Sequence, residues 1–293
     1  ARSNIFHRKG QYEESAENLV NANNMKLRTH KSEVDLLIDK TKKLKISSDN
    51  FESNNQKFEN YPMSIFIVGL PRCGSTLVES IISLNTKVKD LGEINIFEES
   101  YREYKQSEKQ KRLSEIYWKK LEIKDNLTIT TNKWLFNYQY AGIIAKAIPN
   151  AKIIHCYRNP LDNILSTYRA HFATGNNFSS SLVDSAKVYF DQDEIMRIYK
   201  KEFKNHIYSL NYDKLVTHPS DEIKSLIHWL GWSWNDLYLS PHLNKRKVST
   251  RSNVQVRSPI NTKSLGGWKN YKEMLRPAME IITKKDKYKA LKY

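Results

Sequence analysis

The sequence predicts an α/β protein with a parallel sheet covered by helices on both faces, preceded by a short helical segment. From residue 64 onward, short apolar runs alternate with amphipathic stretches, which is typical of buried parallel strands separated by helices. The first apolar run leads through a turn with two glycines into a helical pattern. We therefore expect an N-terminal segment with its linker over residues 1–60 and a main domain over residues 61–293.

The N-terminal segment is expected to be helical to about residue 45. In "GQYEESAENLVNANNMKL", Tyr12, Ala16, Leu19 and Ala22 recur at steps of three and four residues. This stretch resembles one tetratricopeptide unit, which needs neighbouring units to bury its face, but it is equally compatible with a plain helical hairpin. Residues 46–62 are polar and aperiodic, so they are expected to connect the two parts.

The main domain begins with the apolar strand Ile65–Val68. Further strands are expected at residues 128–131, 152–157 and 206–212. Helices are expected at residues 75–83, 98–121 and 181–203, from Pro160 onward, and over "SDEIKSLIHWLGW" with Ser220 as its N-cap. Ligands of such folds bind at the carboxyl ends of the strands.

The turn after the first strand, in "IFIVGLPRCGSTLVESII", predicts an anion site. Gly69 and Gly74 have the G-x-x-x-x-G spacing of the nucleotide-binding P-loop, and Thr76 stands where that motif ends. Backbone N–H groups and the helix dipole favour phosphate or sulfate there. Ser75 replaces the P-loop lysine and Arg72 offers a guanidinium, so the loop is P-loop-like without suiting ATP and magnesium. The spacing also occurs in ordinary strand-to-helix connections, and the motif alone leaves both interpretations open.

The charge balance indicates an anionic ligand. The chain of 293 residues has 48 basic and 32 acidic residues, giving a formal charge of +16. Its lysines are spread along the chain rather than gathered in one stripe, so a nucleic-acid partner is disfavoured. An anionic cofactor or an acidic acceptor accounts for the sign of the charge. No apolar run reaches the length of a membrane span, so no membrane association is expected.

The cysteines exclude some classes of protein. Cys73 and Cys156 are the only two, so no disulfide framework and no zinc-binding cysteine spacing can be built. Two lone thiols fit a reducing compartment, and we expect a cytoplasmic location. The start at Ala1, without methionine or a signal-like stretch, is compatible with a trimmed N-terminus that has lost targeting information.

A second anion pocket is predicted where the strand at residues 152–157 ends. Arg158 follows this strand, Ser166 lies two helical turns later, and Arg169 one turn beyond. Since parallel strands end at one edge of a sheet, two anion pockets at two strand ends predict a ligand that is phosphorylated twice.

Several sequence blocks together resemble a known family. These are "PRCGSTLVESII", "GEINIF", "TNKWLFNY", "IPNAKIIHCYRNPLDNILSTY", "NYDKLVTHP" and "VQVRSPINTKSLGGW". Their order is similar to that in sulfotransferases that use 3′-phosphoadenosine 5′-phosphosulfate (PAPS). In detail the chain resembles the bacterial tetratricopeptide-linked branch, related to protein-tyrosine sulfotransferases. The resemblance covers residues 63–275 and implies PAPS as co-substrate, 3′-phosphoadenosine 5′-phosphate (PAP) as product, and no metal.

The resemblance also implies which residues hold the co-substrate. The residues matching the 5′-phosphosulfate loop are Arg72, Cys73, Gly74, Ser75 and Thr76. Arg158 and Ser166 match the 3′-phosphate contacts, and Tyr212 matches a position near the nucleotide. The late loop over the cofactor is matched by Ser252 to Asn261, including Ser252, Gln255, Val256 and Arg257, with Arg257 as its phosphate ligand.

Three residues match the catalytic groups of the family. Glu93 in "LGEINIF" matches the base, Lys133 matches a lysine that stabilises the transferring or leaving group, and Arg72 neutralises charge on the group in transfer. The mechanism implied is direct in-line transfer without a covalent enzyme intermediate. The tyrosine-sulfating relatives carry paired glutamates where this chain has Glu93 and Ile94, so the position of the base stays open.

Other positions depart from the family pattern. Cys73 replaces the usual serine, and Ser75 replaces the commoner threonine. Gly267 stands where relatives often carry a basic residue, so Lys263 or Lys269 is the alternative source of that contact.

Three functions fit this sequence. The first is a PAPS-dependent sulfotransferase acting on a hydroxyl of a peptide tyrosine, a carbohydrate or a small alcohol. The second is a non-catalytic scaffold on the same fold, and the third is a P-loop kinase of small molecules, disfavoured by the missing lysine and by Arg158 at the second strand end. The basic charge favours an acidic acceptor and the N-terminal helices favour a peptide; the oligomeric state is open.

Overall fold

The computed structural model describes residues 1–52, 62–107, 111–122, 128–172, 175–244 and 257–292. Internal contacts group the chain into two compact units. The first contains Ala1–Thr41, Arg158–Asp193 and Lys263–Tyr293, and the second contains Lys42–Tyr157 and Glu194–Thr262. The sequence predicts an N-terminal segment over residues 1–60 and a main domain over residues 61–293. This domain division stays a prediction.

The second unit contains a parallel sheet of five strands with the order β2-β3-β1-β4-β5. The strands are β1 (Ser64–Gly69), β2 (Val88–Asp90), β3 (Ile129–Asn132), β4 (Ala151–Tyr157) and β5 (Ile207–Asn211). The predicted α/β class with a parallel sheet is confirmed, and the four expected strands are present to within a residue or so at each end. The short edge strand β2 was missed by the sequence prediction.

The central strand β1 is buried along its whole length. Ile65 and Ile67 pack on one face of the sheet, in a cluster with apolar residues of α4 (Ser75–Ile82) and α11 (Pro219–Trp229). Burial on both faces explains why β1 reads as a continuous apolar run rather than as an alternating one.

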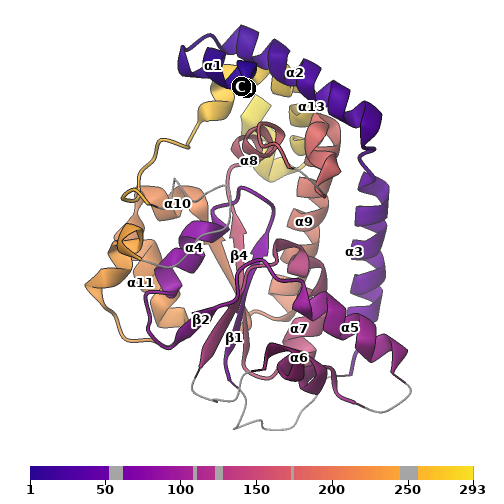
Figure 1. The fold of residues 1–293 in the computed structure, drawn as a ribbon, viewed down its shortest axis with the longest axis vertical. Coiled ribbons are helices and arrows are strands. Elements are labelled where there is room, and N and C mark those ends of the chain that lie inside the picture. Colours follow the sequence, from indigo (N-terminus) through magenta and orange to yellow (C-terminus); the bar gives the residue numbers. More distant parts are fainter. Residues whose placement is uncertain (53–61, 108–110, 123–127, 173–174, 245–256, 293) are drawn as a thin grey trace. The chain divides into compact units, whose positions relative to one another are not determined.

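The opposite face of β1 is covered by aromatic side chains. The Phe66 ring lies 5.7 Å, centroid to centroid, from Phe97 of α5 (Ile96–Gln106) and from Tyr117 of α6 (Leu113–Leu121). Figure 1 shows α4 and α11 on one side of the sheet and α5 and α6 on the other. Helices therefore cover both faces, as predicted.

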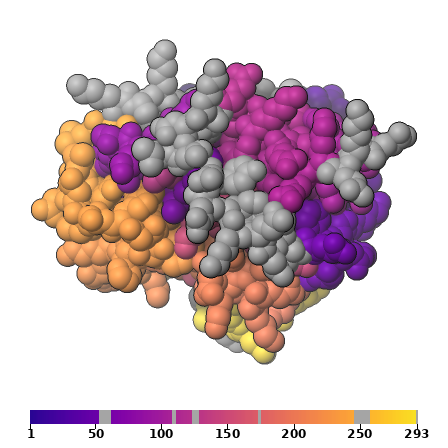
Figure 2. Space-filling model, turned by 90° about the horizontal axis from the view of Figure 1, so that it is seen from below, coloured from indigo at the N-terminus to yellow at the C-terminus, as the bar shows by residue number. Residues whose placement is uncertain are grey.

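Several shorter elements complete the second unit. They are η1 (Leu135–Tyr140), α7 (Ala141–Ala147), α10 (Tyr212–Thr217), η3 (Asp236–Leu239) and η4 (Pro241–Leu243). In Figure 2 the outer surface of α11 and of the turns that follow it is orange, and that of α5 is magenta.

The expected N-cap of α11 was wrong by two residues. The helix begins at Pro219, and His218 rather than Ser220 occupies the N-cap position. Proline suits the first position of a helix because its fixed φ is helical and its missing N–H has no partner to lose there. The same preference is seen at Pro160, where α8 (Pro160–Tyr168) begins as predicted.

The regular elements described in the first unit are all helices. Its elements are α1 (Arg2–Arg8), α2 (Tyr12–Thr29), α8, η2 (Asn177–Ser180), η5 (Gly267–Tyr271), α13 (Lys272–Ile282) and η6 (Asp286–Lys292). Two helices contribute residues to both units, namely α3 (Val34–Asp49) and α9 (Leu182–Glu202).

The buried face of α2 differs from the apolar stripe seen in the sequence. Ser15, Leu19 and Asn23 are buried, whereas Ala22 is exposed. Asn23 Nδ2 donates to the Tyr168 carbonyl at 3.1 Å. Because hydrogen bonds satisfy these polar side chains, the helix buries a polar stripe that apolar periodicity does not reveal.

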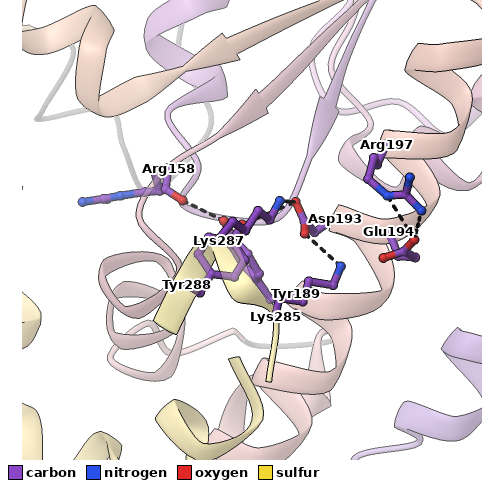
Figure 3. Close-up of polar contacts among 8 residues, drawn as sticks. All are labelled: Arg158, Tyr189, Asp193, Glu194, Arg197, Lys285, Lys287 and Tyr288. Carbon is purple, nitrogen blue, oxygen red and sulfur yellow. Dashed lines mark hydrogen bonds and ion pairs between the residues drawn. The ribbon is translucent and has the colours of Figure 1, made fainter. Parts of the chain in front are cut away.

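Ion pairs hold the C-terminal segment against α9. The ammonium groups of Lys285 and Lys287 lie 3.0 and 2.6 Å from the Asp193 carboxylate (Figure 3). One turn earlier on α9, the Tyr189 hydroxyl donates to the Arg158 carbonyl at 2.7 Å. This helix thus fixes the backbone of Arg158.

Lys146 of α7 caps the C-terminal end of α3, and its removal tests this contact. Its ammonium group donates to the carbonyls of Ser48, Asp49 and Phe51 at 2.7, 3.3 and 3.1 Å. Since hydrogen bonds to a charged donor contribute about 1.5–3 kcal/mol, Lys146→Met should lower the free energy of unfolding by about that amount in urea titrations. The exposed Lys200 provides the control, and Lys200→Met should change it by less than about 0.5 kcal/mol. Equal effects of the two variants would contradict the capping role.

Candidate active site

The loop that joins β1 to α4 starts from a position that only glycine can occupy. Gly69 pairs with Cys156 of β4, and a Cβ on Gly69 would lie 2.4 Å from the Cys156 carbonyl oxygen. Its φ of +152° is also unfavourable for other residues. The first glycine of the motif thus lets the loop leave the sheet directly over β4.

The second glycine brings an aromatic ring to the loop. Gly74 has a φ of +96°, and a Cβ there would lie 2.2 Å from the Tyr212 ring. Tyr212 is the first residue of α10. Its ring therefore packs against the anion loop, the region where the resemblance expects the nucleotide. Arg72, between the two glycines, also has a left-handed backbone, with a φ of +71°.

The start of α4 has the features of an anion site. Gly74 is the N-cap and provides no side-chain cap, and Ser75 and Thr76 form the first two helical positions. The first N–H groups of a helix have no intrahelical acceptor, and the helix dipole places positive charge there. Both side chains are largely buried, so an anion at this end would be shielded from water.

Lys133 and Glu93, the expected catalytic pair, are in direct contact. The Lys133 Nζ lies 2.6 Å from Glu93 Oε1 and 3.8 Å from Glu79 Oε2. The Lys133 side chain is 1% exposed and that of Glu79 is 2% exposed, whereas that of Glu93 is 46% exposed. The site thus joins a buried ammonium group to one accessible and one inaccessible carboxylate. The accessible carboxylate of Glu93 can receive a proton from a bound molecule.

The pKa of the Cys73 thiol reflects the hydrogen bonds and charges around it. A hydrogen bond with Cys156 lowers the pKa of the Cys73 thiol, hydrogen bonds with Ser75 and the charge of Lys133 add to this effect, and burial opposes it. Burial and the neighbouring Cys73 raise the pKa of Cys156. The surroundings of Cys73 therefore favour negative charge on its own sulfur.

In the first unit, Arg158 is buried and held by its surroundings. Its Nη2 donates to the Ser264 carbonyl at 2.6 Å and lies 3.8 Å from Asp162 Oδ2. The Asp162 carboxylate accepts hydrogen bonds from the backbone N–H groups of Gly266 at 2.7 Å and Trp268 at 3.0 Å. Asp162 therefore fixes the late segment beside Arg158.

The remaining predicted site residues belong to different units or lie outside the described residues. Ser166 is half-buried on α8 of the first unit. Arg257 is exposed in the second unit and donates to the Asn244 carbonyl, so the described contact is with protein backbone. Three predicted cofactor residues, Ser252, Gln255 and Val256, lie outside the described residues. The cofactor contacts of all these residues stay predictions.

Sequence reasoning missed Glu79 and Asp162. Both are buried carboxylates beside a predicted cationic residue, Lys133 or Arg158. The available signal was a single acidic residue within the apolar "TLVESII" of α4 and an aspartate four residues after Arg158. His155 of β4 is buried and its ring stacks on that of Tyr157.

Two further searches were confined to the described part of the chain. Within it, no three His, Cys, Asp or Glu residues gather in an arrangement that could hold a metal ion. None of its helices combines the length and apolar character needed to cross a membrane.

The fold and the loop define a class of protein. A parallel sheet whose central strand leads through G-x-x-x-x-G into a helix is a P-loop-like α/β fold, here without the P-loop lysine and with a buried lysine from β3's end near the loop. The model of the sulfotransferase family matches residues 62–236, more than half of the chain. The chain belongs to the sulfotransferase family, as the sequence resemblance predicted.

Two curated relatives match most of the chain. A protein of Aquifex aeolicus, described as uncharacterized, is 29% identical over 242 residues, which cover 74% of this chain and 32% of that protein. Protein-tyrosine sulfotransferase 1 of Danio rerio is 26% identical over 234 residues, covering 70% of this chain and 65% of that enzyme. The match thus spans less than two thirds of the length of either relative.

Solved structures share the fold. The sulfotransferase domain of the Synechococcus PCC 7002 olefin synthase has a TM-score of 0.55 at 13% identity, covering 78% of this chain and 98% of that chain. Mouse sulfotransferase SULT7A1, solved in complex with PAP, has a TM-score of 0.53 at 18% identity, covering 84% and 91%. At these identities the likeness is one of fold.

The contact between Gly74 and Tyr212 predicts a destabilising substitution. Gly74→Ala combines a left-handed backbone, which costs about 1–2 kcal/mol for other residues, with a steric clash of about 1–3 kcal/mol. Gly231→Ala is the matched control, because Gly231 has a φ of +76° but nothing within 4 Å of the added Cβ. Urea unfolding should show a larger loss of stability for Gly74→Ala by about 1–3 kcal/mol. Equal losses would mean that Tyr212 does not pack there.

Proposed function

We propose that this chain transfers a sulfonate group from PAPS to a hydroxyl group of an acceptor. The observation that carries the proposal is the buried Lys133 ammonium, 2.6 Å from the accessible Glu93 carboxylate and close enough to the anion loop to influence Cys73. A cation for the transferred group and a base for the acceptor thus come from the same small region. Family membership and the PAP complex of mouse SULT7A1, a protein of the same fold, support the choice of donor.

The residues of the loop fit the phosphosulfate end of the donor. In this proposal Arg72, Ser75 and Thr76 bind the 5′-phosphosulfate together with backbone N–H groups at the start of α4, where negative charge is favoured. Arg158 and Ser166 bind the 3′-phosphate. Arg158 directly follows β4, the strand that pairs with β1, which leads into the loop. Tyr212 lies against Gly74 and is proposed to border the nucleotide.

The proposed chemistry assigns one proton and one leaving group. Glu93 takes the proton of the acceptor hydroxyl as its oxygen forms a bond to the donor's sulfur. The bond from sulfur to the bridging phosphate oxygen breaks, and that oxygen leaves with PAP. Lys133 and Arg72 stabilise the negative charge that develops on the leaving oxygen and on the transferred group.

The acceptor is proposed to carry a hydroxyl, with peptide tyrosine tested first. The zebrafish relative is named as a protein-tyrosine sulfotransferase, and the charge of +16 suits an acidic peptide. Carbohydrates and small alcohols are the alternatives, which a panel of an acidic tyrosine peptide and oligosaccharides would separate. The tetratricopeptide-like start and the cytoplasmic location stay predictions.

Donor binding is tested by calorimetric titration with PAP, with 5′-AMP and ATP plus magnesium in parallel. PAP should bind, and the other two should bind at least about tenfold more weakly, since each lacks the 3′-phosphate that Arg158 is proposed to contact. Arg158→Ala should weaken PAP binding about tenfold to a hundredfold, the contribution of hydrogen bonds to a charged group.

Because Arg158 is buried, its loss also removes the Ser264 contact. Ser166→Ala provides the milder variant, with an expected loss of about twofold to tenfold. Equal binding of all three nucleotides by the unaltered chain would contradict the two-anion site and favour the scaffold or kinase alternatives.

The role of Glu93 is tested by turnover. Glu93→Gln keeps the size of the side chain but cannot accept the proton, so kcat should fall at least about a hundredfold, with PAP affinity retained. Glu99→Gln, on an exposed position of α5, is the control and should keep the original rate. Full turnover by Glu93→Gln with normal PAP binding would show that another group is the base.

A further inference from the structure

The two carboxylates around Lys133 have different environments. Glu93 lies 2.6 Å from the Lys133 Nζ and is 46% exposed, whereas Glu79 lies 3.8 Å away and is 2% exposed. We infer that Glu79 is a positioning residue, the permanent counter-ion that keeps Lys133 charged and in place while Glu93 releases it during transfer. This inference rests on the proposed function.

Burial explains why Lys133 needs a second partner. An ammonium group that is 1% exposed has lost almost all its hydration, and a buried charge is stable only when it is paired. In the proposed reaction, Glu93 becomes neutral when it takes the acceptor's proton. From that moment its attraction for Lys133 is weaker, and Glu79 is the remaining carboxylate within 4 Å of the ammonium among the ion pairs described for this site.

The surroundings of Glu79 restrain its side chain. It lies on α4 between Val78 and Ser80, both of which are buried. The hydroxyl of Thr131 on β3 donates to Glu79 Oε1 at 3.4 Å. A carboxylate held in this way cannot move to take up the acceptor's proton or to contact the acceptor. Its effect on the reaction is therefore through Lys133. Glu93, in contrast, is half-exposed and can turn to water without a large desolvation cost.

Lys133 and its two carboxylate partners have different roles in the proposed reaction. Before transfer, two carboxylates share one ammonium group, and Glu93 binds it at short distance. Binding of the phosphosulfate and neutralisation of Glu93 both draw Lys133 toward the leaving oxygen. Glu79 stays beside Lys133 throughout, so the buried ammonium group keeps a carboxylate partner and keeps its direction.

Glu79→Gln tests the inference because it removes the charge and keeps the size. Loss of the counter-ion leaves Lys133 without its second carboxylate partner once Glu93 is neutral, so kcat should fall at least tenfold while KM for PAPS changes less than about threefold. Thr131→Val is the matched control, because it removes the 3.4 Å hydrogen bond without changing charge and should lower kcat by less than about threefold.

Glu79→Asp provides a rescue and guards against a folding defect. It retains the charge, so its kcat should stay at least about threefold above that of Glu79→Gln. An unchanged kcat in Glu79→Gln, or a kcat in Glu79→Gln no lower than that of Glu79→Asp, would overturn the inference.

A readout independent of turnover separates this inference from the proposed function. In protein labelled with ¹³Cε-lysine, the Lys133 resonance, assigned by its absence in Lys133→Arg, should change its chemical shift at constant pH in Glu79→Gln, and this change should be smaller in Glu79→Asp. If that change occurs but the unaltered chain transfers no sulfonate from PAPS, the counter-ion role stands and the proposed function fails. If the resonance is the same in Glu79→Gln and in the unaltered chain, the counter-ion role is wrong whatever the turnover.

Discussion

The close approach of Gly69 to the Cys156 carbonyl is the constraint on which the site depends. It occurs where β1 and β4 end side by side, and it leaves no space for a Cβ. The chain can therefore turn immediately above β4 and place Cys73 against Cys156 before α4 begins. A side chain at position 69 would push the loop away from the sheet, and the start of α4 would move with it. The proposed anion site is thus positioned by backbone contact rather than by the residues proposed to bind the anion.

Electrostatics at the loop follow from that position. The thiol of Cys73 is buried, which alone would raise its pKa, yet the hydrogen bond with Cys156, those with Ser75 and the charge of Lys133 lower it. Of these groups, the backbone of Ser75 and the charge of Lys133 do not depend on the side chain at position 73. Replacement of the usual serine by Cys73 therefore leaves both of them in place beside the proposed anion site.

Local signals in the sequence predicted the strands and the loop. The features that were missed depend on contacts between residues far apart in the chain. β1 and α4 were predicted because the apolar run, the two glycines and the helical spacing are adjacent in the chain. The contact between Glu79 and Lys133 depends on α4 and the end of β3 meeting beside β1, which only the strand order shows. In sequence, a glutamate on a helix looks like part of a solvated face. The resemblance to the family supplied Lys133 and Glu93, but not the carboxylate behind them.

The fold does not require glycine at position 267, where relatives often carry a basic residue. A Cβ at this position would meet its nearest neighbour, Asp162 Oδ1, at 3.8 Å, an ordinary contact, and the left-handed backbone belongs to the preceding Gly266. Asp162 binds the N–H groups on either side of Gly267, so the main chain is fixed without help from a side chain. A basic residue could therefore be accommodated here, so packing does not explain its absence. Lys263 and Lys269, the alternative cations expected from the sequence, are both exposed in the same segment.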